Sequence, residues 1–299
     1  MTKAVLTTKA DPGYDDLPEF RYHFPRTYLR QVKAAIGDWI VYYEPRRTSD
    51  HPDSRGGRQA YFATAKITAV QPDPTRADHF YAFISDYLEF DRPVPFREGA
   101  RYYETALRRE DGGTSKGAFG RAVRLLAEEE YQAIVQAGFV ELLQRPAEAS
   151  SVVSEFADEP ATFERPIVET IVARPFRDAA FAIAVKAAYD NTCAMTGLKI
   201  INGGGRAEVQ AAHIRPVADS GPDAVRNGLA LSGTVHWMFD RGLLSVADDY
   251  TILTAKAHLP PAADRLLNPN RRLHLPQGAE MRPHPQFLQF HRECVFKGE

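Results

Sequence analysis

Cysteine is scarce in this chain of 299 residues, which has only Cys193 and Cys294. So few thiols fit a reducing compartment and exclude a disulfide framework. No run of 18 or more apolar residues occurs, which excludes a transmembrane helix, and residues 1–12 lack an apolar core of signal-peptide length. We therefore expect a cytoplasmic protein without a membrane partner.

Charge of one sign is not in excess either, because 37 Lys and Arg oppose 39 Asp and Glu. Residues 1–164 have 21 basic and 26 acidic side chains, whereas residues 165–299 have 16 and 13. A weakly acidic protein does not coat nucleic acid through a global field, so binding must depend on local cations. Two loop clusters are candidates for phosphate contacts, with a solvated surface as the alternative: Arg46, Arg47, Arg55 and Arg58, and then Arg108, Arg109, Lys116, Arg121 and Arg124.

Three polar residues follow one another at a definite spacing in the C-terminal half. Thirteen residues separate His213 from Asn227, and eight separate Asn227 from His236. Residues 208–214 alternate polar and apolar side chains, and residues 229–231 are apolar, so the pattern predicts two short strands joined by a loop.

A helix is predicted directly after the second strand. Ser232 is a good N-cap, and Gly242 suits a helix C-terminus that needs positive φ. His236 and Asp240 are four residues apart and lie on one helix face. One imidazole and one carboxylate at this spacing can share a cation.

This strand, loop, strand and helix resembles the HNH motif, also called the ββα-metal fold. The segments Cys193-Ala-Met-Thr-Gly, Val209-Gln-Ala-Ala-His and Phe239-Asp-Arg-Gly-Leu-Leu look most like the branch found in predicted bacterial restriction endonucleases. The resemblance implies phosphodiester hydrolysis with Mg²⁺ or Mn²⁺. It assigns the site as follows: His213 is the general base, His236 and Asp240 bind the metal, Asn227 braces the loop through side-chain to backbone hydrogen bonds, and Arg215 and Arg241 grip the scissile phosphate.

The chain departs from the wider family at two points. Many HNH proteins carry a metal ligand immediately before the base, where this chain has Ala212. Many also bind a structural zinc through two Cys-x-x-Cys pairs, of which only Cys193 is present. One thiol cannot build a four-ligand site, so we expect no structural zinc and packing by Leu198, Ile200 and Ile201 instead.

The N-terminal half is predicted to be mainly β up to about residue 105. Residues 38–44, 60–70, 79–84 and 88–90 are dense in β-branched and aromatic side chains and predict a small barrel. With a helix near residues 25–35, this order resembles the PUA-like superfamily, which includes EVE and SRA domains, over residues 18–105. The resemblance implies a pocket for a flipped modified base, with core aromatics of the barrel as the alternative reading. The candidates are Phe24, Trp39, Tyr43 and Tyr87 as stacking rings and Asp86 as a reader of an exocyclic amine.

The expected fold class is α+β in two domains. Residues 1–145 would form the PUA-like β-barrel with flanking helices, and residues 167–299 the HNH endonuclease domain. The linker at 146–166 has small and acidic residues with prolines. Residues 116–143 are predicted to form one or two helices with Val123 and Leu126 in an apolar stripe, and residues 177–189 a further helix.

These expectations combine into a modification-dependent DNA endonuclease. It would recognise double-stranded DNA carrying 5-methylcytosine or 5-hydroxymethylcytosine, in a type IV-like restriction system against phage. A homodimer is one candidate assembly, since double-strand cleavage by one-site nucleases often requires two copies, and the sequence leaves the oligomeric state open. Two alternatives stay open: a non-catalytic reader of modified nucleic acid with a decayed nuclease domain, and an HNH nuclease that acts on unmodified DNA or RNA.

Overall fold

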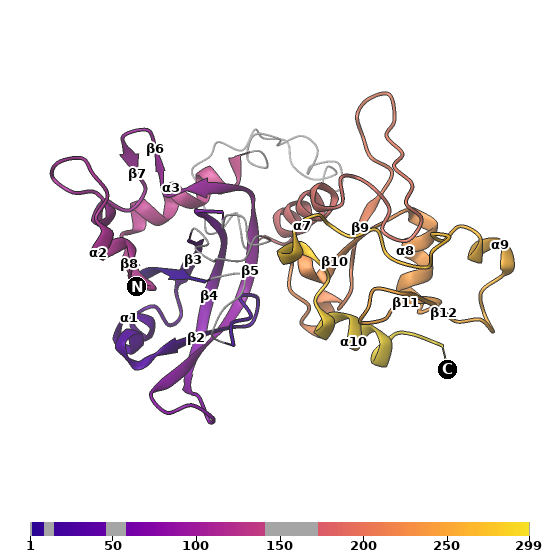
Figure 1. Ribbon diagram of the computed structural model, residues 1–299, viewed down its shortest axis with the longest axis horizontal. Coiled ribbons are helices and arrows are strands. Elements are labelled where there is room, and N and C mark those ends of the chain that lie inside the picture. Colours follow the sequence, from indigo (N-terminus) through magenta and orange to yellow (C-terminus); the bar gives the residue numbers. More distant parts are fainter. Residues whose placement is uncertain (1, 9–14, 46–57, 141–172, 299) are drawn as a thin grey trace, which may run out of the picture. The chain divides into compact units, whose positions relative to one another are not determined.

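The computed structural model describes residues 2–8, 15–45, 58–140 and 173–298. The chain forms two compact units, Met1–Ala180 (unit 1) and Phe181–Glu299 (unit 2), whose elements are labelled in Figure 1. The linker predicted at 146–166 lies outside the described residues. None of the helices in the described ranges has the length and apolar character needed to cross a membrane.

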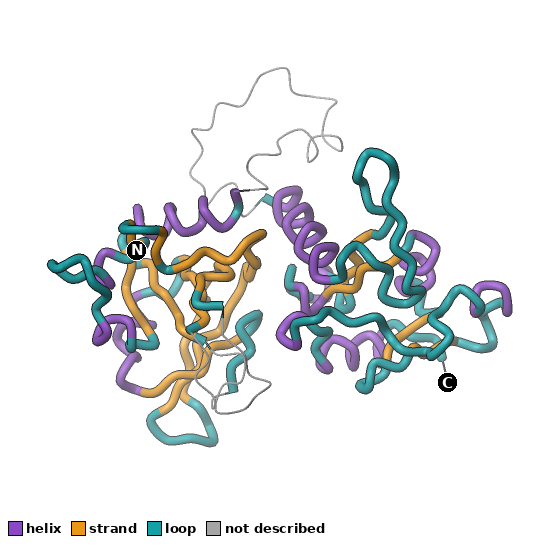
Figure 2. Tube along the Cα trace, turned by 45° about the horizontal axis from the view of Figure 1, so that its top comes forward, coloured by secondary structure: helices purple, strands orange, loops and turns teal. Residues whose placement is uncertain are grey.

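Unit 1 is built on a curled sheet, drawn in orange in Figure 2. The sheet has six strands in the order β2-β5-β4-β3-β1-β8. β1 and β3 are parallel, and the other neighbours are antiparallel. All residues of β3 are buried, because a central strand is covered on both faces. The strands are β1 (Lys3–Thr7), β2 (Arg21–Pro25), β3 (Trp39–Glu44), β4 (Ala60–Pro72), β5 (His79–Pro95) and β8 (Val123–Leu126).

Short helices and one small hairpin complete unit 1. Helix α3 packs on β4 and β5 and buries Tyr131, Ile134 and Val135. The elements are a 3-10 helix (Arg26–Tyr28), α1 (Leu29–Ala34), β6 (Arg97–Glu98), β7 (Arg101–Tyr102), a second 3-10 helix (Thr105–Leu107), α2 (Lys116–Phe119) and α3 (Glu128–Gly138).

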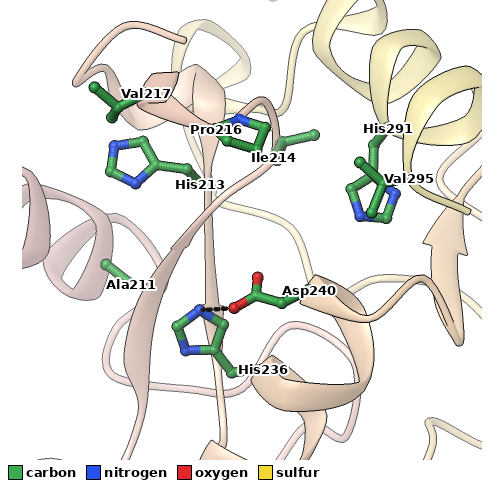
Figure 3. Close-up of a pocket in the computed structure, with 9 residues that line it drawn as sticks. All are labelled: Ala211, His213, Ile214, Pro216, Val217, His236, Asp240, His291 and Val295. Atoms are coloured by element: carbon green, nitrogen blue, oxygen red, sulfur yellow. Dashed lines mark ion pairs between the residues drawn. The ribbon is translucent and has the colours of Figure 1, made fainter. Parts of the chain in front are cut away.

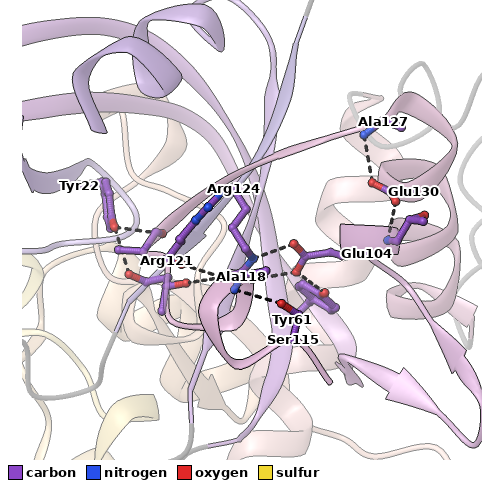
Figure 4. A network of polar contacts seen from close by, with 12 residues as sticks. Tyr22, Tyr61, Glu104, Ser115, Ala118, Arg121, Arg124, Ala127 and Glu130 are labelled. Carbon is purple, nitrogen blue, oxygen red and sulfur yellow. Dashed lines mark hydrogen bonds and ion pairs between the residues drawn. The ribbon is translucent and has the colours of Figure 1, made fainter. Parts of the chain in front are cut away.

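A buried ion pair ties these elements together (Figure 4). Arg124 on β8 donates from Nε to Oε2 of Glu104 at 2.6 Å, and Glu104 also accepts from the Tyr61 hydroxyl on β4 at 2.6 Å. The expectation that Arg124 contacts phosphate is therefore wrong, because its guanidinium is buried and neutralised by a carboxylate.

Two sequence predictions for unit 1 are corrected by the sheet. Residues 123–126, expected to be helical, form β8 and pair antiparallel with β1. Residues 79–84 and 88–90, expected to be separate strands, belong to the single strand β5, which has an irregular register beside Asp86, a residue with φ of +53°. Among the described strands β2 and β8 form the two edges of the sheet, so a closed PUA-like barrel stays a prediction.

Unit 2 contains two small hairpins surrounded by helices. The predicted strands at 208–214 and 229–231 and the helix that follows them are confirmed as β9, β10 and α8, with somewhat shorter or longer bounds. Its core includes Leu229, Val235 and Phe287. The elements are α7 (Arg174–Ala188, in unit 2 from Phe181 onward), β9 (Gln210–His213), β10 (Gly228–Leu231), α8 (Gly233–Asp240), β11 (Leu244–Val246), β12 (Ile252–Thr254), α9 (Pro261–Asp264) and α10 (Pro285–Cys294). Three 3-10 turns complete it: Val217–Asp219, Val225–Asn227 and Ala279–Met281.

Candidate active site

The hairpin of β9 and β10 places His213 against helix α7. His213 ends β9 and pairs with Gly228, the first residue of β10. Its ring stacks on Phe181 of α7, with centroids 3.8 Å apart and an interplanar angle of 11°. A Cβ at Gly228 would lie 2.4 Å from Cγ2 of Val185, so only glycine lets α7 approach the hairpin this closely. The imidazole is half-buried, and its ring plane is fixed by the stack.

A carboxylate that the sequence reasoning missed contacts this imidazole. Nε2 of His213 lies 3.0 Å from Oδ1 of Asp223, and Asp223 is only 3% exposed. Asp223 lies in the loop between the two strands, directly after Gly221 and Pro222. No periodic pattern marks such a loop position, so the contact appears only once the chain is folded.

Asn227 holds the two ends of that loop together. Its side chain is fully buried, and Oδ1 accepts from the backbone N–H of Arg215 at 2.9 Å. Nδ2 donates to the carbonyl oxygens of Arg215 and Pro222, each at 2.9 Å. All three bonds join the amide to the backbone, which is the kind of contact that the sequence analysis assigned to this residue.

Helix α8 carries the proposed metal pair on one face. Nε2 of His236 lies 3.4 Å from Oδ2 of Asp240. The other ring nitrogen, Nδ1, is 2.8 Å from the carbonyl oxygen Oε1 of Gln210, which accepts a hydrogen bond and cannot donate one. With hydrogen on Nδ1, Nε2 is the ring nitrogen left to bind a cation beside Asp240.

The ends of α8 are fixed by contacts with neighbouring segments. Ser232 is the N-cap residue as predicted, but its side chain makes no capping bond, and Oε1 of Glu208 accepts from the N–H of Gly233 at 3.0 Å instead. Gly242 follows the helix with φ of +72°, as predicted, and a Cβ there would lie 2.1 Å from the carbonyl oxygen of Val295. These contacts hold His236 and Asp240 in place.

A cavity of about 470 Å³ is lined by the base candidate His213 and by both members of the metal pair (Figure 3). Its lining consists of Ala211, His213, Ile214, Pro216, Val217, His236, Asp240, His291 and Val295. A cluster of three or more His, Cys, Asp or Glu side chains suited to a metal does not occur among the described residues. The protein would thus supply two ligands, His236 and Asp240, and a hard cation can complete its shell with water and phosphate oxygens.

The missing third ligand does not belong at Ala212. Ala212 is fully buried and pairs with Leu229 in the core, whereas its neighbour Ala211 lines the cavity. Successive side chains of a strand point to opposite faces, so residues 211 and 213 share the cavity face and residue 212 does not.

The prediction that three apolar side chains pack in place of a zinc site is wrong. Leu198, Ile200 and Ile201 are about half exposed, at 51%, 49% and 46%. Cys193 is fully buried instead, and its Sγ accepts from the backbone N–H of Ser232 at 3.3 Å. The thiol thus joins its own segment to the start of α8.

The third histidine of the cavity, His291 on α10, makes contacts that join neighbouring elements of the fold. Its Nδ1 is 2.9 Å from the Ser245 hydroxyl, its Nε2 is 3.2 Å from the carbonyl oxygen of Phe239, and its ring stacks on Phe239. Burial lowers the pKa of His291 to about 4. The ring is therefore neutral at physiological pH and ties α10 to β11 and α8.

Comparison with known families agrees with this geometry. Residues 193–247 match the family model described as HNH endonuclease. The HNH match contains the hairpin and helix that carry His213, Asn227, His236 and Asp240. An HNH endonuclease domain indicates a nuclease, which hydrolyses phosphodiester bonds. No curated protein matches the chain.

Two solved structures were found as neighbours of the full chain. The first, titled "Modification dependent TagI restriction endonuclease", is 16% identical with a TM-score of 0.32, and the alignment covers 97% of this chain and 81% of that one. The second, the "Type IV phosphorothioation-dependent restriction endonuclease ScoMcrA", is 12% identical with a TM-score of 0.20 and coverages of 97% and 52%. This chain thus spans about half the length of ScoMcrA. TM-scores this low do not establish a shared fold.

The arginines predicted to contact DNA differ in whether their guanidinium groups already contact other residues of the protein. Arg215 donates from Nε to the carbonyl oxygen of Asp219 at 2.7 Å and lies over the ring of Phe290, so its guanidinium is held within the HNH unit. Arg241, directly after α8, is exposed. Arg58 pairs with Glu44 at 3.1 Å. Arg46, Arg47 and Arg55 lie outside the described residues.

The proposed base-pocket residues are spread over three strands of unit 1. Trp39 and Tyr43 lie on β3, Phe24 on β2 and Tyr87 on β5, and all four rings are at most 6% exposed. Asp86 is exposed at the irregular point of β5.

The neighbours of these rings differ. Phe24 stacks with Phe80, Tyr43 meets Tyr61 edge-on, and Tyr87 lies beside Tyr42. A pocket shared by the predicted residues stays a prediction.

Proposed function

We propose that this protein is a metal-dependent HNH endodeoxyribonuclease that cuts double-stranded DNA carrying modified cytosine. The observation that carries the nuclease part is that His213, His236 and Asp240 line the same cavity. A proton acceptor and a pair of metal ligands at one opening are the groups that phosphodiester hydrolysis requires.

His213 is the general base of this reaction. A neutral imidazole can take a proton from water as the water attacks phosphorus. The stack on Phe181 and the loop closed by Asn227 keep the ring in one orientation while water attacks phosphorus.

His236 and Asp240 hold Mg²⁺ or Mn²⁺. When bound, the cation neutralises charge on the phosphoryl oxygens and on the departing 3′ oxygen. Gln210 keeps the hydrogen of His236 on Nδ1, which leaves Nε2 for the cation. The exposed Arg241 grips the scissile phosphate.

The N-terminal unit is the reader in this proposal. Its resemblance to PUA-like domains and its wealth of aromatic side chains support recognition of a flipped 5-methylcytosine or 5-hydroxymethylcytosine. The biological role is restriction of phage DNA with modified bases, carried out by a homodimer when both strands are cut.

One observation favours a second candidate, an HNH nuclease that acts on unmodified DNA or RNA. Phe24, Trp39, Tyr43 and Tyr87 are buried as core aromatics would be. In that case the first unit only binds nucleic acid and does not distinguish bases.

The decisive experiment compares three matched duplexes that are unmodified, methylated and hydroxymethylated at cytosine. Each is incubated with the full chain in Mg²⁺ and in Mn²⁺, with EDTA as a control and His213→Ala as the test variant. We expect cleavage of the modified duplexes only, with loss of at least a hundredfold in rate for His213→Ala. Equal cleavage of all three duplexes selects the second candidate. Binding of modified DNA without any cleavage makes the protein a reader with a decayed nuclease domain.

A further inference from the structure

We propose that Asp223 is a positioning residue for His213, which keeps the proton on Nε2 of the imidazole and the lone pair on Nδ1. The inference rests on the proposed function, in which His213 accepts the proton of water. With this inference the candidate site contains a loop carboxylate as well as the imidazole, the asparagine and the metal pair.

The hydrogen-bond chemistry of the pair fixes the tautomer. A carboxylate accepts hydrogen bonds and donates none, so the contact of 3.0 Å between Oδ1 of Asp223 and Nε2 of His213 requires the hydrogen on Nε2. A neutral imidazole carries one hydrogen, which leaves Nδ1 as the acceptor for water. Asp223 is 3% exposed, and low solvent access strengthens an electrostatic hydrogen bond.

Two contacts from different elements together fix the ring. Phe181 on α7 sets the plane of the imidazole, and Asp223 selects one of the two flipped ring orientations that share this plane. Turning the ring by 180° about its Cβ–Cγ bond would move Nε2 away from the carboxylate and lose the bond. The orientation with Nδ1 available is therefore the one with the lower energy.

Asp223 is itself held by the residue that braces the loop. Nδ2 of Asn227 donates to the carbonyl oxygen of Pro222, the residue directly before Asp223. Gly221 donates to the carbonyl oxygen of Pro216 at 2.9 Å, and a Cβ on Gly221 would lie only 1.9 Å from the carbonyl oxygen of Arg215. Asn227 thus acts on the base partly through the backbone that carries Asp223.

The carboxylate has a second effect during proton transfer. Nδ1 of His213 takes a proton from the attacking water, and the ring becomes a cation with hydrogens on both nitrogens. The Nε2 hydrogen stays on the ring, and the negative charge of Asp223 next to it stabilises the cation. No proton passes to Asp223.

The test uses the full chain with Asp223→Asn and Asp223→Ala, and Asp219→Asn as the matched control. Asp219 lies in the same loop with an exposed position, so its variant removes the same charge without touching His213. We expect both Asp223 variants to lower the single-turnover cleavage rate by about a hundredfold or more, while the dissociation constant for DNA changes less than about threefold. Formate is expected to restore part of the rate to Asp223→Ala, which a purely structural role would not allow.

A second measurement needs no variant and no activity. The ¹⁵N shifts of the His213 ring in the wild-type chain, assigned by comparison with His213→Ala, report which nitrogen carries the hydrogen. Hydrogen on Nε2 supports the proposal, and hydrogen mainly on Nδ1 overturns it. Because the wild-type chain is measured, this result decides the question even if the Asp223 variants fail to fold.

The kinetic outcomes separate this inference from the proposed function. If His213→Ala is inactive but folded Asp223→Asn and Asp223→Ala cut within threefold of wild type, Asp223 does not position the base and the nuclease assignment stands. If His213→Ala still cuts DNA, the assignment of the base itself fails.

Discussion

At the residue scale, His291 shows how burial decides the charge of a side chain next to the cavity. Burial lowers its pKa to about 4, from an ordinary value of 6.5. Between these two pH values the unfolded chain binds a proton that the folded chain does not. The free energy of unfolding therefore falls as the pH falls from 6.5 to 4.

We predict that His291→Gln makes unit 2 less stable at pH 7 but flattens this dependence on pH. The slope lost is up to about 1.4 kcal/mol per pH unit, which corresponds to one proton. Urea unfolding of the wild-type protein and the variant at pH 7, 6 and 5 measures this slope. Other titrating groups contribute equally to the two proteins, so their effect cancels in the difference. One such group is Asp16, whose pKa is raised to about 6 by burial. Parallel pH curves for the two proteins would contradict the assignment to His291.

Some residues of the candidate site could be predicted from the sequence, and others could not. His213, His236 and Asp240 could be found because a spacing and a helix periodicity mark them. Asp223 could not, because it lies in a loop and its partner is ten residues earlier on a strand. Leu198, Ile200 and Ile201 were assigned to packing from their apolar character alone, and apolar residues can equally remain at the surface.

At the scale of elements, local signals succeeded where contacts are local. β9, β10 and α8 follow one another within residues 210–240, so strand alternation and helix ends could be seen in one window. β8 could not be found in this way. Its apolar residues fit a helix spacing, and its strand partner β1 lies more than 100 residues earlier in the chain.

The loop between β9 and β10 gives a prediction at this scale. We expect Gly221→Ala to lower the free energy of unfolding by about 2–4 kcal/mol, because the added Cβ meets the backbone of Arg215 and the loop must shift. Gly203→Ala is the matched control, since a Cβ there meets open space. Thermal and urea unfolding of the two variants measure the difference. Equal stability of the two variants would show that the loop adapts without cost.

At the scale of the whole molecule, the distribution of charge limits how DNA can be held. The net charge is −2, and neither lysine nor arginine is among the residues that line the cavity. A protein that neutralises few phosphates loses affinity slowly as salt rises. Specificity must then come from contacts other than a general attraction to the backbone.

We predict that binding to DNA weakens about 40-fold when KCl is raised from 50 to 200 mM, as expected for about three phosphate contacts. Arg241→Gln should reduce the slope of log affinity against log salt by about one, since the proposed function places its exposed guanidinium at one phosphate. Arg265→Gln on the C-terminal side of α9, away from the residues that line the cavity, serves as control. Fluorescence anisotropy with labelled duplex measures both slopes. An unchanged slope for Arg241→Gln would remove this residue from the interface.

The orientation of Ala211 and Ala212 restricts the positions at which a mutation could add a metal ligand and raise the affinity for the cation. An acidic side chain gained at position 212 would be buried against Leu229 and would cost stability without reaching the cavity. The same mutation one residue earlier would face the open space beside His213. A stronger metal centre is therefore accessible through position 211, although the family pattern points to its neighbour.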